Sequence, residues 1–327
     1  MTGLLAGIDI GGTKCAVSLG RLRTADDSIE IVKKISFPTP VGHEATIQQL
    51  VEALAEALLA IDNKDSSLSA IGISCGGPLD SSKGLINSPP NLPGWDQVDI
   101  VSPFREYFGV KVGLQNDANA CALAEWKWGA GKGTSNMVFL TFGTGMGAGL
   151  ILNGQLYAGT NDLAGEIGHI RMESSGPIGF GKAGSFEGFC SGGGIVQLAN
   201  QMTEQHLHNG GTSILSSSYE QGLSLTAKVV SEAAEHNDTL ALRILHQVSY
   251  QLGRGLAILI DILNPEMIVI GSIYARQEKL LQANMLEVVQ QEAIPSAWSR
   301  CSIVPAAFGD QVGDYAALSV ALHTWGK

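Results

Sequence analysis

The chain has 327 residues, of which 45% are hydrophobic and 16% charged, and its formal net charge is −11. This length predicts one large or two medium domains, and the acidic balance argues against unaided binding to nucleic acid or to an anionic membrane. No apolar run is long enough to predict a membrane span, and residues 1–12 do not resemble a signal peptide. The five scattered cysteines are typical of a reducing compartment, so we expect a cytoplasmic protein.

The first part of the chain predicts strands and helices in alternation. Period-2 and buried apolar patterns predict strands at 4–10, 15–20, 28–37, 69–74 and 110–115. Apolar residues at helical spacing predict a helix at 44–62, and a second helix is expected at 117–129. Asp117 stands at the start of that second helix, where aspartate is a common N-cap. A rigid, proline-rich loop is expected at 87–95.

The second part opens like the first and then becomes mostly helical. Residues 136–152 predict a strand, a glycine turn and a returning strand. Further elements are expected as helices at 224–236, 239–261 and 312–325, and as strands at 266–272 and 300–306. The runs "AGIDIGGTKCAVSLG" and "FLTFGTGMGAGLILNG" share one plan of strand, glycine turn and strand. This internal similarity favours a duplicated α/β domain with a ligand cleft between the two copies.

Three familiar motifs match in letters but not in context. "GISCG" at 72–76 fits a hydrolase nucleophile elbow, but no helix is expected directly after the serine. "GTGMGA" at 143–148 fits a dinucleotide fingerprint, but a hairpin follows instead of a helix. "GAGKGTS" at 129–135 lacks the Ser or Thr that must follow the lysine of a P-loop. The sequence therefore does not predict a hydrolase, an NAD enzyme or a P-loop NTPase.

The two glycine turns favour phosphate binding. Glycine makes up 41 residues, about one in eight against an average near 7%, and backbone amides in glycine turns can form anion-binding nests. Asp9, before the first turn, can hold Mg²⁺ through water. The turn residues expected to contact phosphates are Gly11, Gly12, Thr13 and Lys14 in the first copy, and Gly143, Thr144 and Gly145 in the second.

The stretch "LAGEIGHIRM" places Glu166 and His169 three residues apart in an apolar, glycine-rich run. The pair could be zinc ligands, acid–base catalysts, hydrogen-bonding partners of a polar ligand, or a buried ion pair. The residues alone leave these four alternatives open.

The motifs "GIDIGGTK", "GISCGGPLD", "NDANACALAEW", "GTGMGAGLI" and "GEIGH" together resemble the ROK family of sugar kinases and sugar-responsive repressors. The resemblance spans roughly residues 4–320 and implies a two-lobed, actin-like (ribonuclease H-like) α/β fold. It implies lobes at 1–117, completed by 312–327, and at 118–311. It also implies that ATP with Mg²⁺ donates its γ-phosphoryl group to a sugar hydroxyl. Repressor members carry an N-terminal DNA-binding domain, whereas this chain begins at the first phosphate hairpin, which favours a kinase.

The resemblance also implies roles for individual residues. Asp117 matches the catalytic base, which accepts the proton of the sugar hydroxyl, and we expect the helix dipole to keep it ionised. Gly271 matches the nucleotide loop. The residues expected at the sugar are Gly77, Asn91, Asn116, Asp117, Glu166, His169 and Glu187.

The chain departs from the family where most members bind zinc. The family's C-x-C-G-x-x-G-C stretch reads "IGFGKAGS" here, so that its three cysteines become Ile178, Phe180 and Ser185. One histidine cannot make a structural zinc site, which needs about four nitrogen or sulfur ligands. We therefore expect no zinc, and we expect packing of Ile178, Phe180 and Phe186 to hold the loop instead.

A hexose kinase is the leading functional prediction, with two alternatives from other classes. One is a sugar-sensing regulator without catalysis, and the other is an ATPase that uses no sugar. The segment "SPPNLPGW" resembles glucokinase-like members, so glucose leads over N-acetylglucosamine, N-acetylmannosamine, fructose and mannose. Relatives are often dimers, so a homodimer is an open possibility.

Overall fold

The structure is a computed structural model that describes residues 3–23, 27–61 and 67–326. The chain forms two compact units, the first made of residues 1–135, 149–164 and 307–327, and the second of residues 136–148 and 165–306. The resemblance implied a boundary between the lobes after residue 117, whereas the two units are divided after residues 135, 148, 164 and 306. Residues 62 and 327, at the ends of two predicted segments, lie outside the described residues.

The first unit is built on a five-stranded sheet of order β3-β2-β1-β4-β8. The antiparallel part is β1 (Leu4–Ile10), β2 (Lys14–Arg23) and β3 (Ser28–Pro38). Two strands, β4 (Leu68–Cys75) and β8 (Lys111–Asn116), then run parallel to β1. A small sheet of β5 (Leu79–Asp80), β6 (Leu85–Ile86) and β7 (Val98–Asp99) follows β4, and α3 (Asp117–Trp128) follows β8. The five strands of the large sheet and α3 begin within a few residues of their predicted positions, whereas β5, β6 and β7 were not predicted.

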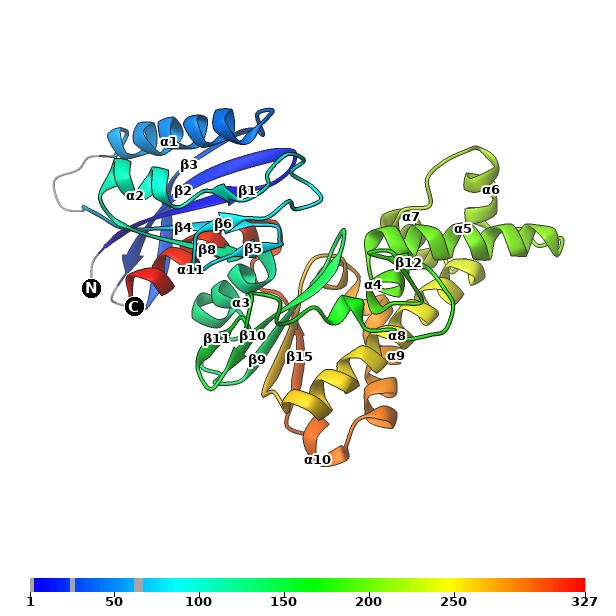
Figure 1. The fold of residues 1–327 in the computed structure, drawn as a ribbon. Helices are drawn as coiled ribbons and strands as arrows, with labels where there is room; N and C mark the ends of the chain where they lie inside the picture. The colour runs from blue at the N-terminus through cyan, green and yellow to red at the C-terminus, as the bar shows by residue number, and fades with distance from the viewer. Residues whose placement is uncertain (1–2, 24–26, 62–66, 327) are drawn as a thin grey trace. The chain divides into compact units, whose positions relative to one another are not determined.

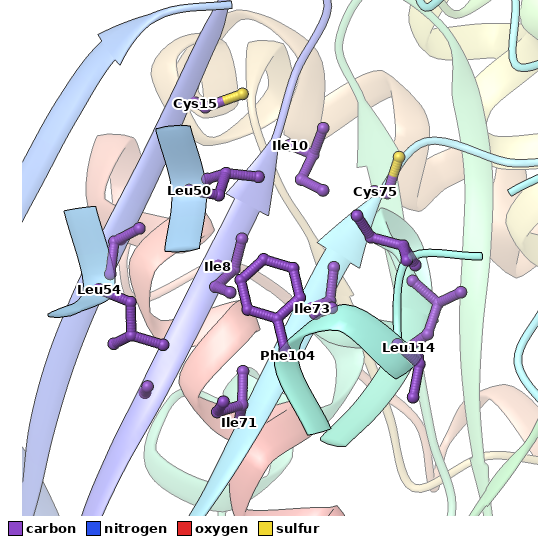
Figure 2. Close-up of a cluster of buried hydrophobic side chains, with 14 of the residues drawn as sticks. Ile8, Ile10, Cys15, Leu50, Leu54, Ile71, Ile73, Cys75, Phe104 and Leu114 are labelled. Carbon is purple, nitrogen blue, oxygen red and sulfur yellow. The ribbon is translucent and has the colours of Figure 1, made fainter. Parts of the chain in front are cut away.

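One face of this sheet carries the main hydrophobic core. Helices α1 (His43–Leu59) and α2 (Ser102–Phe108) lie on this face (Figure 1). Figure 2 shows the alternate residues of the strands, such as Ile8 and Ile73, meeting Leu50 of α1 and Phe104 of α2. All four side chains are fully buried, as the alternation of a strand and the apolar stripe of a helix predict.

The opposite face of the same sheet is lined with glycine and covered by α11 (Val312–Trp325). Gly7, Gly72 and Gly113 are neighbours in register on β1, β4 and β8. A Cβ atom at Gly72 would lie 2.2 Å from the backbone oxygen of Ala317 in α11. The glycine row therefore lets the last helix of the chain pack directly on strands formed near its beginning.

A second five-stranded sheet repeats the strand plan of the first. It has the order β11-β10-β9-β14-β15, in which a hairpin is again followed by two parallel strands, and its residues between 149 and 164 are grouped with the first unit. The strands are β9 (Met137–Phe142), β10 (Met146–Leu152), β11 (Gln155–Tyr157), β14 (Met267–Ile270) and β15 (Ser302–Pro305). The matching order of the two sheets confirms the predicted duplicated α/β fold.

The remaining elements of the second unit are mainly helical. The long helices are α5 (Gly192–His208), α8 (Thr239–Leu263) and α9 (Ile273–Glu292). Shorter ones are α4 (Phe186–Phe189), α6 (Ile214–Glu220), α7 (Ala227–Glu235) and α10 (Pro295–Trp298). A two-stranded hairpin, β12 (Ile178–Gly179) and β13 (Lys182–Ala183), precedes α4. Within the described part of the chain, no helix is long and apolar enough to cross a membrane.

Candidate active site

The carboxyl ends of the three parallel strands in the first unit carry several of the predicted site residues. Ile10, Cys75 and Asn116 are aligned across β1, β4 and β8, so the three strands end at one edge of the sheet. This edge is where open α/β sheets bind ligands. The structure thereby places the turn after Asp9 and the start of α3 at Asp117 on the same edge.

The turn between β1 and β2 has the features of a phosphate cradle. The amide of Gly11 donates to the carbonyl of Lys14 at 3.1 Å, and Thr39 Oγ1 donates to the carbonyl of Gly11 at 2.6 Å. No acceptor among the described residues is paired with the amides of Gly12 and Thr13. Any Cβ at Gly12 would lie 2.3 Å from a backbone oxygen of the neighbouring 87–95 loop, so only glycine fits. Exposed, unpaired amides in a narrow turn suit phosphate oxygens.

The oxygen that approaches Gly12 belongs to Asn91. Trp95 is buried and its carbonyl accepts a hydrogen bond of 2.6 Å from the amide of Ser88, which closes the loop. The side chain of Asn91 is exposed and would lie 3.2 Å from a Cβ at Gly76, next to Gly77. The predicted contacts Asn91 and Gly77 are thus brought to the same strand edge as the phosphate turn.

Helix α3 begins at Asp117, as predicted, but Asp117 is not its N-cap. Asn116 is the N-cap, and its side chain accepts a 2.7 Å hydrogen bond from the amide of Asn119. Asp117 is instead the first residue of the helix, and its Oδ1 accepts from the amide of Ala118 at 2.8 Å. The capping position is filled by the neighbouring amide, which leaves the carboxylate of Asp117 outside the capping interaction.

The side chain of Asp117 keeps surface open to solvent, although protein atoms crowd around it. Their displacement of water raises the pKa of Asp117, and hydrogen bonds from the backbone amides of Ala118 and Asp117 itself oppose this. The amides at the start of α3 lower the pKa of Asp117 and so act in the direction expected of the helix N-terminus, while burial acts against them. A carboxylate with a raised pKa is a stronger proton acceptor than an ordinary aspartate.

Asp9 is half-buried beside charged residues that were not singled out from the sequence. Burial, followed by the charges of Asp314 and Asp117, raises the pKa of Asp9 to about 6, while Lys34 and Lys14 lower it. Asp314 of α11 accepts from Lys34 Nζ at 2.5 Å and from Ser18 Oγ at 2.9 Å. Its position some 280 residues from Lys34 explains why no local pattern indicates this pairing.

The second unit has its own glycine turn, between β9 and β10. The amide of Gly143 donates to the carbonyl of Gly145 at 3.1 Å. Glu187, predicted to contact the sugar, accepts from the amide of Met146 at 3.0 Å, so one of its oxygens supports this turn. Gly271, at the end of the adjacent parallel strand β14, donates to Leu140 of β9 at 2.9 Å. Thr144 lies between the two turn glycines. Because β9 and β14 are parallel neighbours, the turn after β9 and Gly271 after β14 lie at the same edge of the sheet.

Glu166 and His169 bracket a short 3₁₀ helix, Ile167–His169. The amide of His169 donates to the carbonyl of Glu166 at 3.1 Å, which keeps the two residues together. Both side chains are exposed. Their exposure excludes the buried ion pair as the reason for this spacing.

The loop between His169 and α4 is held by hydrogen bonds. Gln197 of α5 donates to the carbonyl of Ile178 and accepts from its amide, both at 2.9 Å. Arg171 Nη1 donates to the carbonyl of Ala183 at 2.6 Å. The expected packing was wrong for two of three residues, because Ile178 is 54% and Phe180 74% exposed, whereas Phe186 is fully buried.

Across the part of the chain that the structure describes, no three His, Cys, Asp or Glu side chains gather as a metal-binding group. The positions of the three replaced cysteines, Ile178, Phe180 and Ser185, offer one weak ligand, the Ser185 hydroxyl, which instead donates to the carbonyl of Gly179 and accepts from the amide of Gly188. The donor set therefore does not fit zinc.

Comparison with known proteins agrees with this geometry. The sequence profile of the ROK family matches residues 5–323. The chain belongs to the ROK family. A glucokinase of Halalkalibacterium halodurans is 33% identical over 94% of this chain and 91% of its own length. A Streptomyces griseus ROK family glucokinase, solved with glucose and AMPPNP, superposes with a TM-score of 0.74 at 26% identity, covering 98% of this chain and 100% of that one.

The family also contains regulators. A putative xylose repressor of Caldicellulosiruptor sp. is 27% identical over 89% of this chain and 71% of its own length. Membership of the family thus establishes the two-lobed fold and leaves the activity to be argued from the site.

Proposed function

We propose that the protein is an ATP-dependent hexose kinase that transfers the γ-phosphoryl group of ATP to a hydroxyl of glucose. The observation that carries this proposal is the edge of the first sheet, where the Asp9 turn and Asp117 lie at the ends of strands that flank β4. A phosphate cradle and a carboxylate base are the two groups that phosphoryl transfer to an alcohol requires. Similarity to a glucokinase over 94% of the chain supports the same activity.

In the proposed reaction, Asp117 accepts the proton of the attacking sugar hydroxyl. The sugar oxygen forms a bond to the γ-phosphorus while the bond from that phosphorus to the β–γ bridging oxygen breaks, and ADP leaves. The crowded surroundings that raise the pKa of Asp117 make it a better acceptor for this proton.

The phosphates of ATP are assigned to the two glycine turns. The turn at Gly12 fits a phosphate because the amides of Gly12 and Thr13 have no acceptor among the described residues, and a side chain at Gly12 would collide with Asn91. Asp9, next to the cradle, would hold Mg²⁺ through water, and the metal would neutralise phosphate charge. The residues assigned to ATP are Gly11, Gly12, Thr13, Lys14, Gly143, Thr144, Gly145 and Gly271.

The sugar is assigned to residues whose side chains or amides can hydrogen-bond hydroxyls. Glutamate and asparagine oxygens accept hydrogen bonds from hydroxyls, and a neutral histidine can donate or accept. The residues assigned to the sugar are Gly77, Asn91, Asn116, Asp117, Glu166, His169 and Glu187. Glucose is proposed because the 87–95 loop resembles that of glucokinases, and the closeness of Asn91 to Gly12 and Gly76 supports this assignment. The expected place of such an enzyme is the cytoplasm, where ATP is available.

A sugar-sensing regulator is the second candidate, because repressors are among the relatives. ATP turnover should be measured without sugar and with glucose, mannose, fructose, N-acetylglucosamine and N-acetylmannosamine. A kinase turns over ATP only with a sugar, and glucose should give the highest kcat/KM. Turnover without sugar would instead indicate an ATPase, and sugar binding without turnover would indicate a regulator. A higher kcat/KM for another sugar would replace glucose and keep the kinase.

A further inference from the structure

The β12–β13 hairpin contains a residue that does not suit its backbone. The two turn residues, Phe180 and Gly181, have φ values of 44° and 74°. Two-residue hairpin turns with two positive φ angles favour Asn-Gly, because asparagine and glycine tolerate the left-handed region. An aromatic residue is disfavoured there. The first turn position thus carries a side chain that the turn itself does not require.

The exposure of this side chain is also unusual for a large apolar group. The ring of Phe180 is 74% exposed, so burial in the core does not account for it. The hairpin is held by hydrogen bonds that do not involve the ring. They join the side chains of Gln197 and Arg171 to the backbone of Ile178 and Ala183, respectively. A strained and exposed aromatic residue points to a role outside folding.

The hairpin holds His169 at two points. The ring of Phe180 meets the imidazole edge-on, with 6.2 Å between ring centroids and 77° between planes, within the range of favourable aromatic pairs. Lys182, on the other strand, donates from Nζ to the carbonyl of His169 at 2.6 Å. The backbone and the side chain of His169 are therefore both set by this hairpin.

We propose that Phe180 is a specificity-determining residue of the sugar site, which orients the imidazole of His169 and covers the apolar C–H face of a pyranose. The inference rests on the proposed function, which assigns His169 to the sugar. A pyranose presents hydroxyls at its rim and C–H groups on its faces. An exposed aromatic ring beside a hydroxyl-binding imidazole matches both surfaces and gains stability when the sugar covers it.

The test compares Phe180→Asn with Phe180→Tyr. Asparagine suits the turn, so the Tm of Phe180→Asn should be equal to or above that of the wild type. The KM for glucose should nevertheless rise roughly 3- to 10-fold, since aromatic contacts contribute a limited free energy, while the KM for ATP stays constant. Phe180→Tyr keeps the ring and should stay within about 2-fold of the wild type. The ratio of kcat/KM for glucose over fructose should fall in Phe180→Asn alone.

Ile178→Asn is the matched control, because Ile178 is exposed on the same hairpin at 54%. It should leave the KM for glucose unchanged. A double-mutant cycle of Phe180→Asn with His169→Ala should be non-additive, because one residue acts through the other.

The outcomes separate the inference from the function on which it rests. A wild-type enzyme that phosphorylates no sugar would overturn both. An active wild type whose Phe180→Asn variant keeps its glucose KM, or loses affinity for ATP equally, would overturn only the inference. Isothermal titration of glucose without nucleotide gives the same comparison independently of turnover, and equal affinity in both proteins would again contradict it.

Discussion

At the scale of single residues, Asp117 is the group on which the proposed chemistry depends. Asparagine has nearly the same shape but cannot accept the proton, so Asp117→Asn should lower kcat by about 10²–10⁴-fold. The Kd for glucose should change only a few-fold, because the hydrogen-bonding position is kept. Steady-state kinetics and calorimetry measure the two quantities. A variant that keeps most of its kcat would remove Asp117 from the role of base.

The same residue makes a pH dependence expected. A base works only when ionised, so activity falls as pH falls through its pKa. Because the pKa of Asp117 is raised from 3.8, the acid limb of kcat/KM should have its midpoint above 3.8. A midpoint at or below that value would contradict the proposed electrostatics.

In the ligand-free protein at neutral pH, the ionised side chain of Asp9 should lower the free energy of unfolding. Its pKa of about 6 lies above the ordinary 3.8, so the native state binds more protons than the unfolded state between these values. Stability from this group is therefore lost as pH rises through that window. With EDTA at pH 8, Asp9→Asn should raise the free energy of unfolding by up to about 2 kcal/mol.

At pH 4 the gain from Asp9→Asn should vanish, because Asp9 is then protonated in the native state. Urea unfolding at both pH values tests this, and kinase assays should show that the stabilised variant has lost activity. Equal effects at pH 4 and pH 8 would show that the charge of Asp9 is not the cause.

At the scale of elements, the glycine row on β1, β4 and β8 lets α11 pack directly on the sheet of the first unit. Gly72→Ala would place a methyl group 2.2 Å from two backbone atoms of α11, so we expect a loss of about 1–3 kcal/mol or more. Gly326, just after the same helix, has a φ of −77°, and an added Cβ would make an ordinary contact of 3.6 Å with the carbonyl oxygen of Leu322, so Gly326→Ala is the matched control. It should be neutral or slightly stabilising. Equal stability of the two variants in urea would contradict this packing.

The hairpin loop before α4 should be independent of metal. Gln197 makes two hydrogen bonds to Ile178 where relatives place a zinc-binding cysteine. The purified protein should contain no stoichiometric zinc, and EDTA should leave its Tm unchanged without nucleotide. Gln197→Ala should speed hydrogen exchange at the amide of Ile178. One zinc per chain in elemental analysis would overturn this expectation.

Elements with a clean period were predictable from the sequence, and others were not. The strand pattern of β1 and the helical pattern of α1 are local, so both appear in the sequence. Helix α5 begins with three glycines and has no such signal. Gly194 is required there because a Cβ atom would lie 1.8 Å from a backbone oxygen of Gly188. Helix α9 is interrupted at Gln277, whose φ of −121° breaks the period.

The candidate site was predictable only as far as its motifs reach. The turn after Asp9 and the position of Asp117 follow from short patterns. The bond from the amide of Met146 to Glu187 and the pairing of Lys34 with Asp314 join residues distant in sequence. Tertiary contacts of this kind cannot be predicted from a local sequence pattern. They determine which partners a carboxylate such as Glu187 or Asp314 binds.

At the scale of the whole molecule, two copies of one strand plan supply different residues to the proposed reaction. The first copy carries Asp9 and Asp117, and the second carries Glu166 and His169. Glucose at about 100 times its Kd should stabilise the native protein by about 2.7 kcal/mol, because it binds only the folded state. His169→Ala should remove most of this gain in a thermal shift at the same glucose concentration. An unchanged gain would place His169 away from the sugar.

The helix that closes the first unit is synthesised long after the strands that it covers. Until α11 has emerged, the glycine row and the neighbouring Leu5 and Ala70, both fully buried beneath it in the finished protein, have no cover. The first unit therefore cannot complete its fold until α11 has been synthesised, although most of its residues are made early. A nascent chain stopped before residue 307 should present this surface to molecular chaperones, and a chain extended through α11 should no longer do so.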